Sequence, residues 1–215
     1  MARNLCTQCQ RPTRACICDF IYKINNIIPV LVLQHPTEVK QVKGTVALLE
    51  RSFDLCQVLV GEDFTKNTEL NHLLAKHSSV LLYPSKQAQV IPLNINGSYN
   101  KQQFFDNNKP PLLIILDGTW KKVYRMFMLS KNLQSLKQIC LPDIVANQGQ
   151  YLIRKVAKAK ALSSLEATCY ALSLLEGDLQ KISISPTNQG IDCGCYQPLI
   201  NKFVQFNQFQ LSFRK

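Results

Sequence analysis

Short apolar runs alternate with helical stretches along most of this chain, and this alternation limits the fold more than any other feature. Five runs rich in valine, isoleucine and leucine are expected to be strands: Pro29–Leu33, Cys56–Val60, Val80–Tyr83, Leu112–Leu116 and Gln138–Leu141. Four stretches are expected to be helices: Lys43–Ser52, Leu70–Lys76, Trp120–Leu129 and Ser164–Glu176. Strands separated by helices form parallel sheets, and densely apolar strands are covered on both faces. We therefore predict an α/β fold with a mainly parallel sheet and helices on both faces.

The last expected helix has the clearest boundaries. Ser163 and Glu166 have the spacing of a capping box, and Gly177 can end the helix. The polar segment 94–111 is expected to be a surface excursion between strands.

Four cysteines near the N-terminus predict a metal site. Cys6, Cys9, Cys16 and Cys18 are spaced as C-x-x-C and C-x-C, and a turn at Arg11-Pro12 can bring the two pairs together. Four thiolates suit a closed, structural zinc site, and zinc would supply folding energy that a segment with few apolar residues lacks. The alternative is a set of free or redox-active thiols. We predict a Cys-rich zinc-binding element over residues 1–25 and an α/β domain over 26–215.

The charge and the cysteine count restrict the partners and the compartment. The chain has 25 Lys and Arg residues and 14 Asp and Glu residues, which gives a formal charge of +11. This excess favours a polyanionic partner, although a basic protein without such a partner would have the same charge. No run approaches the roughly 20 apolar residues of a membrane span, and the N-terminus is unlike a signal peptide. We expect a cytoplasmic protein without a membrane partner, in which nine cysteines serve metal binding or the core. The role of Cys193 and Cys195 stays open.

Polar and turn-forming residues follow four of the expected strands: His35-Pro36, Pro84-Ser85, Asp117-Gly118-Thr119-Trp120 and Pro142-Asp143. Ligands of open α/β sheets bind beyond the carboxyl ends of the strands. Asp117 and Gly118 are therefore candidates for a small-molecule pocket. In the alternative, Asp117 or Thr119 only caps the next helix, and Trp120 belongs to the core.

Two basic clusters flank this expected pocket in the sequence, Lys121, Lys122 and Arg125 in the first, and Arg154, Lys155, Lys158 and Lys160 in the second. They would suit a rim that holds phosphates, although solvated helix faces would look the same. Glycine-rich phosphate loops, dinucleotide fingerprints and H-E-x-x-H are absent from the sequence, so nucleotide-hydrolase, dinucleotide and zincin functions lack support.

Taken in order, these motifs resemble the DTW-domain family of tRNA-uridine aminocarboxypropyltransferases. The pattern runs C-x-x-C-x-R-P…C-x-C, H-P-x-E, a Tyr-Pro turn, D-x-T-W and Y-x-x-R-K…L-S-x-x-E-A, and it covers nearly the whole chain. Gly44 and Ala157 depart from the residues we would expect in such a family. The resemblance implies a SPOUT-related fold with a C-terminal trefoil knot, S-adenosylmethionine as donor and methylthioadenosine as by-product.

The resemblance also implies the site residues. The expected donor-binding residues are Tyr83, Pro84, Ser85, Asp117, Gly118, Thr119, Trp120, Leu141, Pro142, Leu162, Ser163 and Glu166. The expected RNA-binding residues are His35, Lys43, Lys121, Lys122, Arg125, Arg154, Lys155 and Lys158. Asp117 is the expected catalytic residue, because a partly desolvated carboxylate can accept the proton of a uridine imide; alternatively, it orients the substrate. His35 alone would more commonly be structural.

Two other functions remain possible at this point, a SPOUT-like RNA methyltransferase and a zinc-containing RNA-binding protein without catalysis. In every case we expect tRNA or another RNA as the partner, no obligatory protein partner, and a monomer.

Overall fold

A six-stranded sheet with parallel neighbours forms the centre of the computed structural model, which describes residues 4–93, 103–147, 162–177 and 192–213. The strand order is β2-β1-β5-β3-β6-β4. The prediction of a mainly parallel sheet is confirmed, and the short strand β4 is an addition to it. The strands are β1 (Val30–Gln34), β2 (Cys56–Val60), β3 (Ser78–Leu82), β4 (Gln89–Val90), β5 (Pro111–Asp117) and β6 (Lys137–Cys140).

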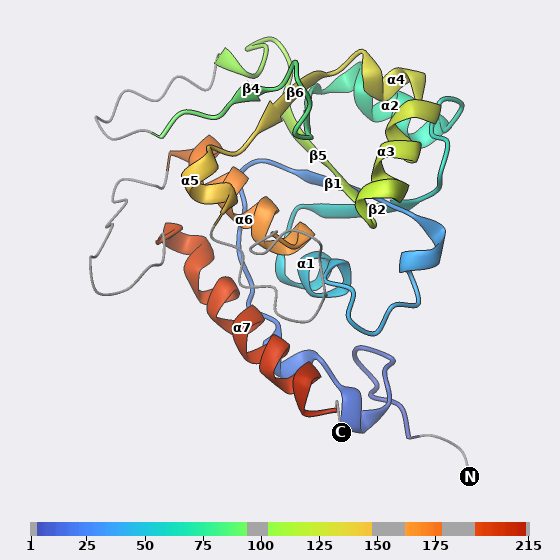
Figure 1. Cartoon of the computed structure of the whole chain (residues 1–215), viewed down its shortest axis with the longest axis vertical. Helices are drawn as coiled ribbons and strands as arrows, with labels where there is room; N and C mark the ends of the chain where they lie inside the picture. The colour runs from blue at the N-terminus through green and yellow to red at the C-terminus, as the bar shows by residue number, and fades with distance from the viewer. Residues whose placement is uncertain (1–3, 94–102, 148–161, 178–191, 214–215) are drawn as a thin grey trace.

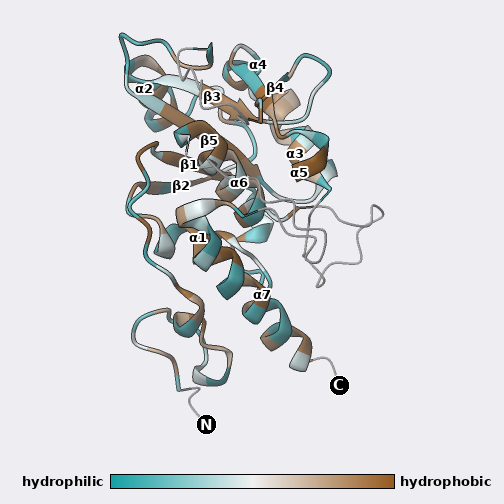
Figure 2. Ribbon diagram, turned by 90° about the vertical axis from the view of Figure 1, so that its left-hand side faces the viewer, coloured by the Kyte–Doolittle hydropathy of each residue, from teal (hydrophilic) through white to brown (hydrophobic). Residues whose placement is uncertain are grey.

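Helices cover both faces of the sheet, as predicted (Figure 1). Helices α2, α3 and α4 pack on one face, and α1 and α6 pack on the other. Side chains alternate along β1: Val30 and Val32 lie in one apolar cluster, and Leu31 and Leu33 lie in the other. The apolar strands lie between the two helical layers in Figure 2. The α-helices are α1 (Val46–Ser52), α2 (Thr68–Lys76), α3 (Trp120–Leu129), α4 (Lys131–Gln134), α5 (Asp143–Ala146), α6 (Ser164–Glu176) and α7 (Gln197–Ser212).

Helix α6 begins and ends where the sequence predicted. The Ser163 side chain accepts a 3.2 Å hydrogen bond from the Glu166 backbone, and the Glu166 carboxylate accepts a 2.7 Å bond from the Ser163 backbone. Gly177 follows the helix with φ 75°, a left-handed conformation that glycine adopts without a Cβ clash. Most of the side chains of α6, from Leu165 to Leu175, are buried. The helix therefore contacts the core around most of its circumference rather than along one face.

The N-terminal segment packs against a helix that the sequence did not predict. Phe20 ends the 3-10 turn η2 (Cys18–Phe20), and its ring contacts Phe206 and Phe209 of α7 at centroid distances of 5.6 and 5.2 Å. Figures 1 and 2 place the N-terminal segment and the end of α7 at the same end of the molecule. Three further 3-10 turns are η1 (Thr13–Ala15), η3 (Pro36–Glu38) and η5 (Gly194–Tyr196).

Two features of the predicted fold stay predictions. The chain segments 148–161 and 178–191, which precede and follow α6, lie outside the described residues, so the structure leaves the trefoil knot untested. The division into 1–25 and 26–215 is also untested, although Cys9, Ile17 and Ile24 are buried in the same apolar cluster as the sheet. Within the described residues, no helix has the length and apolarity needed to cross a membrane.

Candidate active site

The connections that leave β1 and β5 run in opposite directions across the sheet. The connection that leaves β1 runs through α1 on one face to β2, whereas the connection that leaves β5 runs through α3 on the other face to β6. Such a switch point opens a crevice at the carboxyl ends of the two strands, where open α/β sheets bind ligands. The last residues of these strands, Gln34 and Asp117, are partners in the parallel register.

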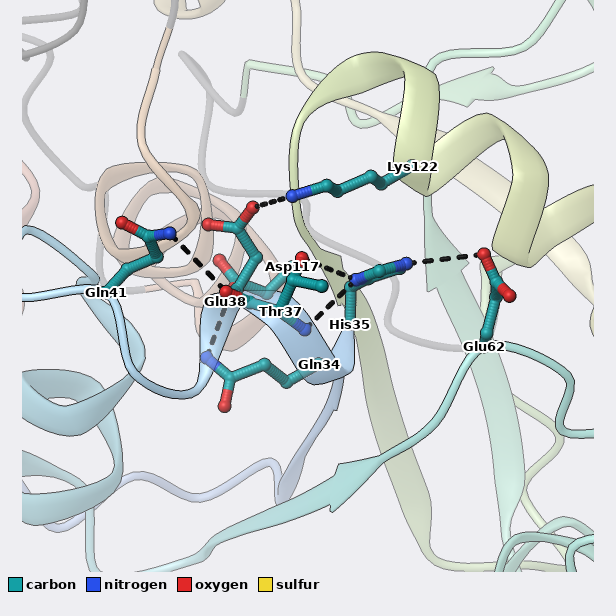
Figure 3. Close-up of polar contacts among 8 residues, drawn as sticks. All are labelled: Gln34, His35, Thr37, Glu38, Gln41, Glu62, Asp117 and Lys122. Atoms are coloured by element: carbon teal, nitrogen blue, oxygen red, sulfur yellow. Dashed lines mark hydrogen bonds and ion pairs between the residues drawn. The ribbon is translucent and has the colours of Figure 1, made fainter.

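Asp117 is a buried carboxylate held by a donor on each oxygen. The Gln34 side-chain amide donates to Oδ2 at 3.0 Å, and the Ser164 hydroxyl donates to Oδ1 at 2.6 Å. Asp117 itself is only 6% exposed. The two donors come from β1 and from the first turn of α6, so three elements fix the orientation of this one carboxylate (Figure 3 shows the Gln34 side).

His35 belongs to a chain of contacts beside Asp117. Its backbone N–H donates to the Asp117 carbonyl at 3.0 Å. The Thr37 backbone donates to His35 Nδ1 at 3.2 Å, which assigns the proton to Nε2, 3.3 Å from a Glu62 oxygen. The same Glu62 oxygen lies 3.0 Å from Arg125 Nε. With both ring nitrogens engaged and 8% exposure, His35 is placed to fix the loop after β1 rather than to reach a distant ligand.

A second ion pair ties the same loop to α3. Lys122 Nζ lies 2.7 Å from a carboxylate oxygen of Glu38, which is 4% exposed (Figure 3). Gly118 permits this close packing, since a Cβ there would lie 3.3 Å from Lys122 Cβ and 3.6 Å from His35 Cβ. In the loop between β1 and α1, a Cβ at Gly44 would approach the Gln41 carbonyl oxygen to 3.0 Å, so glycine avoids a close contact there.

The predicted donor-binding residues follow three neighbouring strands. Asp117 ends β5, Tyr83 follows β3, and Leu141 follows β6, in the spatial order β5-β3-β6. Tyr83 stacks on Phe127 at a centroid distance of 4.6 Å, and burial, together with the neighbouring Tyr124, raises the pKa of its hydroxyl.

The remaining donor-binding candidates lie beside these three. Pro84 and Ser85 continue from Tyr83, and Pro142 continues from Leu141. Leu162, Ser163 and Glu166 surround Ser164, whose hydroxyl contacts Asp117.

Gly118, Thr119 and Trp120 follow Asp117 directly. Thr119 precedes α3 without capping it through its side chain, and Trp120 is 59% exposed, so neither residue takes the purely structural role that the sequence had allowed.

The expected RNA-binding residues have different surroundings. Lys121 is exposed, and the Arg125 side chain is 67% exposed although it pairs with Glu62. Lys122 is paired with the buried Glu38, and Lys43 is half-buried in the loop before α1. Arg154, Lys155 and Lys158 lie outside the described residues.

The four N-terminal cysteines form a compact cluster. Their sulfur atoms all lie within 4.8 Å of one another, with Cys6 and Cys18 at 3.7 Å and Cys9 and Cys16 at 3.7 Å. Four thiolates about 2.3 Å from a zinc ion would be spaced by about 3.8 Å, so the cluster fits a tetrahedral metal ion. Backbone N–H groups of Cys9 and Gln8 lower the pKa of Cys6 to about 6, whereas burial and the neighbouring thiols raise the pKa of Cys18 to about 12. The cluster could therefore hold a metal ion.

A cavity of about 300 Å³ lies between the Cys-rich segment and the switch point. Arg11, from the segment between the cysteine pairs, lines it together with Gln34 and Glu38. Arg11 is fixed there by a 2.9 Å bond from its guanidinium to the Val42 carbonyl, and burial lowers the pKa of its guanidinium. The segment that carries the cysteine cluster thus contributes a residue to the cavity that Gln34 also lines.

The family profile of the DTW domain matches residues 3–211, which is nearly the whole chain. The chain belongs to the DTW-domain family. Among curated relatives, the tRNA-uridine aminocarboxypropyltransferase 2 of Macaca fascicularis is 30% identical over 182 residues, 81% of this chain and 57% of that protein. The protein of the same name from Drosophila melanogaster is 28% identical and covers 86% of this chain and 72% of its own length.

A less similar relative, the tRNA-uridine aminocarboxypropyltransferase A of Arabidopsis thaliana, is 24% identical over 84% of this chain and 75% of its own length. The chain therefore spans little more than half of the Macaca protein and about three quarters of the Drosophila and Arabidopsis proteins. No solved structure gave a significant match to it.

Four residues of this site were not among the predicted ones. Gln34, Ser164, Glu38 and Glu62 hold Asp117, Lys122 and His35 in place. Two of them stand next to predicted residues in the sequence, since Gln34 precedes His35 and Ser164 follows Ser163. Glu38 is the acidic residue of the H-P-x-E motif, whereas no sequence signal marked Glu62. The contacts themselves could not be found from the sequence, because the partners lie far apart along the chain.

Proposed function

We propose that this chain transfers the 3-amino-3-carboxypropyl group of S-adenosylmethionine to the imide nitrogen of a uridine in tRNA and releases methylthioadenosine. One observation carries the proposal: at the switch point of a DTW-domain sheet, a buried carboxylate, Asp117, is held by donors from two other elements. The names of the DTW-domain relatives supply the reaction and the RNA class.

The reaction requires one proton acceptor and close control of geometry. The imide nitrogen loses its proton and forms a bond to the γ-carbon of the donor, while the bond between that carbon and the sulfonium sulfur breaks. Each oxygen of Asp117 accepts one hydrogen bond from the protein and has a second lone pair left. Asp117 accepts the imide proton in this proposal, and Gln34 and Ser164 are positioning residues that keep its free lone pairs facing the crevice.

The donor occupies the crevice at the ends of β5, β3 and β6 in this proposal. Its contacts are the residues that follow these strands and the start of α6: Tyr83, Pro84, Ser85, Gly118, Thr119, Trp120, Leu141, Pro142, Leu162, Ser163 and Glu166. The donor supplies an electrophilic carbon activated by a positively charged sulfur. The protein has to turn the aminocarboxypropyl arm, rather than the methyl group, towards the nucleophile, and such positioning supplies much of an enzyme's rate enhancement. The trefoil knot that the resemblance to SPOUT-like folds implies is part of this proposal.

The metal site and the basic residues have supporting roles. We propose that Cys6, Cys9, Cys16 and Cys18 hold a structural zinc ion, because four thiolates leave no open position for substrate. Lys121 and Arg125, with Lys43 and the cluster Arg154, Lys155 and Lys158, would contact tRNA phosphates. The charge of +11 favours such contacts.

The experiment uses two forms of S-adenosylmethionine with unmodified tRNA, one labelled in the carboxypropyl arm and one in the methyl group. Transfer of the arm label alone supports the proposal. Transfer of the methyl label alone would instead show a methyltransferase, and binding of tRNA without transfer of either label would show an RNA-binding protein. The Asp117→Asn variant serves as control, since it keeps the size of the side chain but cannot accept the proton as a carboxylate does.

A further inference from the structure

The solvent-facing side of α3 carries large apolar side chains. Trp120, Tyr124 and Met128 are 59%, 58% and 50% exposed, and their spacing of four residues places them on one face of the helix. Val123 and Met126 are buried on the face towards the sheet. The exposed face of a surface helix is ordinarily polar, so a continuous apolar stripe there indicates a surface that binds something.

Positive charge borders this stripe. Lys121 and Arg125 are exposed beside it, and residues 120–129 include no acidic side chain. Glu62 partly neutralises Arg125, but Lys121 adds to the excess charge of +11. This favours a polyanion over a second copy of the chain, because a symmetric contact would bring the same cations of both copies together.

The stripe starts at the candidate active site. Helix α3 begins three residues after Asp117, so Trp120 lies at the carboxyl ends of the strands, and Tyr124 and Met128 lead away from them. Tyr124 is close enough to Tyr83 to influence it electrostatically, and Tyr83 stacks on Phe127. From Trp120 to Met128 the helix rises about 12 Å, at about 1.5 Å per residue, enough for a few nucleotides.

We propose that Tyr124 and Met128 form a stacking platform for unpaired nucleotides of tRNA next to the target uridine, that Trp120 marks the end of this platform beside the donor, and that Lys121 binds the phosphates of these nucleotides. Exposed aromatic rings bordered by cations bind single-stranded RNA because every base has a face that can stack, whereas paired bases are already stacked on one another. The inference rests on the proposed function only in taking tRNA as the RNA.

The test measures the Kd of unmodified tRNA by fluorescence anisotropy at a single salt concentration. Tyr124→Ala should raise the Kd roughly 5- to 100-fold, the range of one lost stacking contact, and Met128→Ala should raise it by less. Tyr124→Phe keeps the ring and should stay within about twofold of the wild type. Leu55→Ala is the matched surface control, since Leu55 is 44% exposed just before β2 at the opposite end of the sheet, and it should leave the Kd unchanged.

Two further readouts separate stacking from other effects. The Kd of a fully paired RNA duplex should be the same for the wild type and for Tyr124→Ala. The affinity for S-adenosylmethionine, measured by calorimetry without RNA, should be unchanged in both Tyr124 variants. Circular dichroism melting confirms that the variants are folded, as expected for exposed positions.

Unchanged tRNA affinity in Tyr124→Ala and in the double variant with Met128→Ala would overturn the inference. A wild-type dimer in sedimentation that becomes a monomer in Tyr124→Ala would also overturn it, because the stripe would then bind a second copy. Failure of the proposed function looks different: the wild type would bind tRNA through the stripe, and the variants would weaken binding, but no group would be transferred.

Discussion

The hydroxyl of Ser164, the first residue of α6, donates a 2.6 Å hydrogen bond to the carboxylate of Asp117, the last residue of β5. The neighbouring capping box of Ser163 and Glu166 fixes the helix end that carries Ser164. A helix N-terminus also favours a nearby negative charge. The position of the proposed catalytic carboxylate is therefore determined by how α6 begins, and this can be tested at two adjacent serines.

Ser164→Ala should lower kcat/KM for tRNA roughly 10- to 100-fold, because Ser164 orients Asp117. It should also lower the free energy of unfolding by about 1–3 kcal/mol, since the buried carboxylate loses a hydrogen bond. Ser163→Ala should lower the free energy of unfolding by about 0.5–2 kcal/mol, the usual effect of losing an N-cap, with a smaller loss of activity. Steady-state kinetics and urea denaturation of both variants check this. Equal activity losses in the two variants would contradict separate roles for the two serines.

Lys122→Met should destabilise the fold by about 1–3 kcal/mol, because it leaves the Glu38 carboxylate, which is 4% exposed, without its ion-pair partner. Since the Lys122 side chain is 32% exposed, solvent limits the effect. Urea denaturation of Lys122→Met, Glu38→Gln and the double variant measures the coupling between the two residues. The affinity for tRNA is also measured at several salt concentrations. If the free energy of unfolding is unchanged in Lys122→Met and the affinity depends less on salt than in the wild type, Lys122 contacts a phosphate instead.

Local sequence patterns predicted the positions of most strands and of several helices. They did not predict the order of the strands in the sheet. The bounds of α6 were predictable because Ser163, Glu166 and Gly177 mark its two ends within the local sequence. Helix α7 was missed, since its many Gln and Asn residues hide an apolar face that includes Phe203 and Phe206. The pairing of β1 with β5 joins residues 83 positions apart, and no local signal contains it.

The same distinction applies to the candidate site. Asp117 stood out because it follows the most apolar strand and precedes Gly118. Gln34 looked like an ordinary strand end, and Ser164 was explained by the helix start, because only the strand register and the position of α6 bring both to Asp117. The cysteine cluster was more predictable, since all of its ligands lie within one short segment.

If the cysteine cluster holds zinc as proposed, removal of the metal should loosen α7 as well as the N-terminal segment. The ring of Phe20, two residues after Cys18, contacts Phe206 and Phe209 of α7, so loss of the metal-held turn would leave these rings without a partner. Treatment with a chelator, or Cys9→Ser, should lower the melting temperature and the helical circular dichroism signal. Metal analysis should give one zinc ion per chain before treatment. A metal-free protein with unchanged melting would contradict a structural role for the cluster.

The stability of the fold should decrease in alkaline solution. Burial raises the pKa of the Cys193 thiol to about 12, while an unfolded thiol titrates near about 8.5. The folded state therefore binds the proton more tightly, and its contribution to stability is complete below pH of about 8.5 and is lost as the pH rises towards about 12. The slope is up to about 1.4 kcal/mol per pH unit for one thiol.

Urea denaturation at several pH values, with reductant present, should show a smaller alkaline loss for Cys193→Ala than for the wild type. An identical pH dependence of the two proteins would show that Cys193 does not contribute to it.

The proposed reaction is best measured by mass spectrometry of the nucleosides from unmodified tRNA, after incubation with the protein and S-adenosylmethionine. We expect a uridine that carries the aminocarboxypropyl mass, with methylthioadenosine in equal amount, and neither product with Asp117→Asn. Unmodified or only methylated nucleosides from the wild-type reaction, with zinc present and several tRNAs tried, would contradict it.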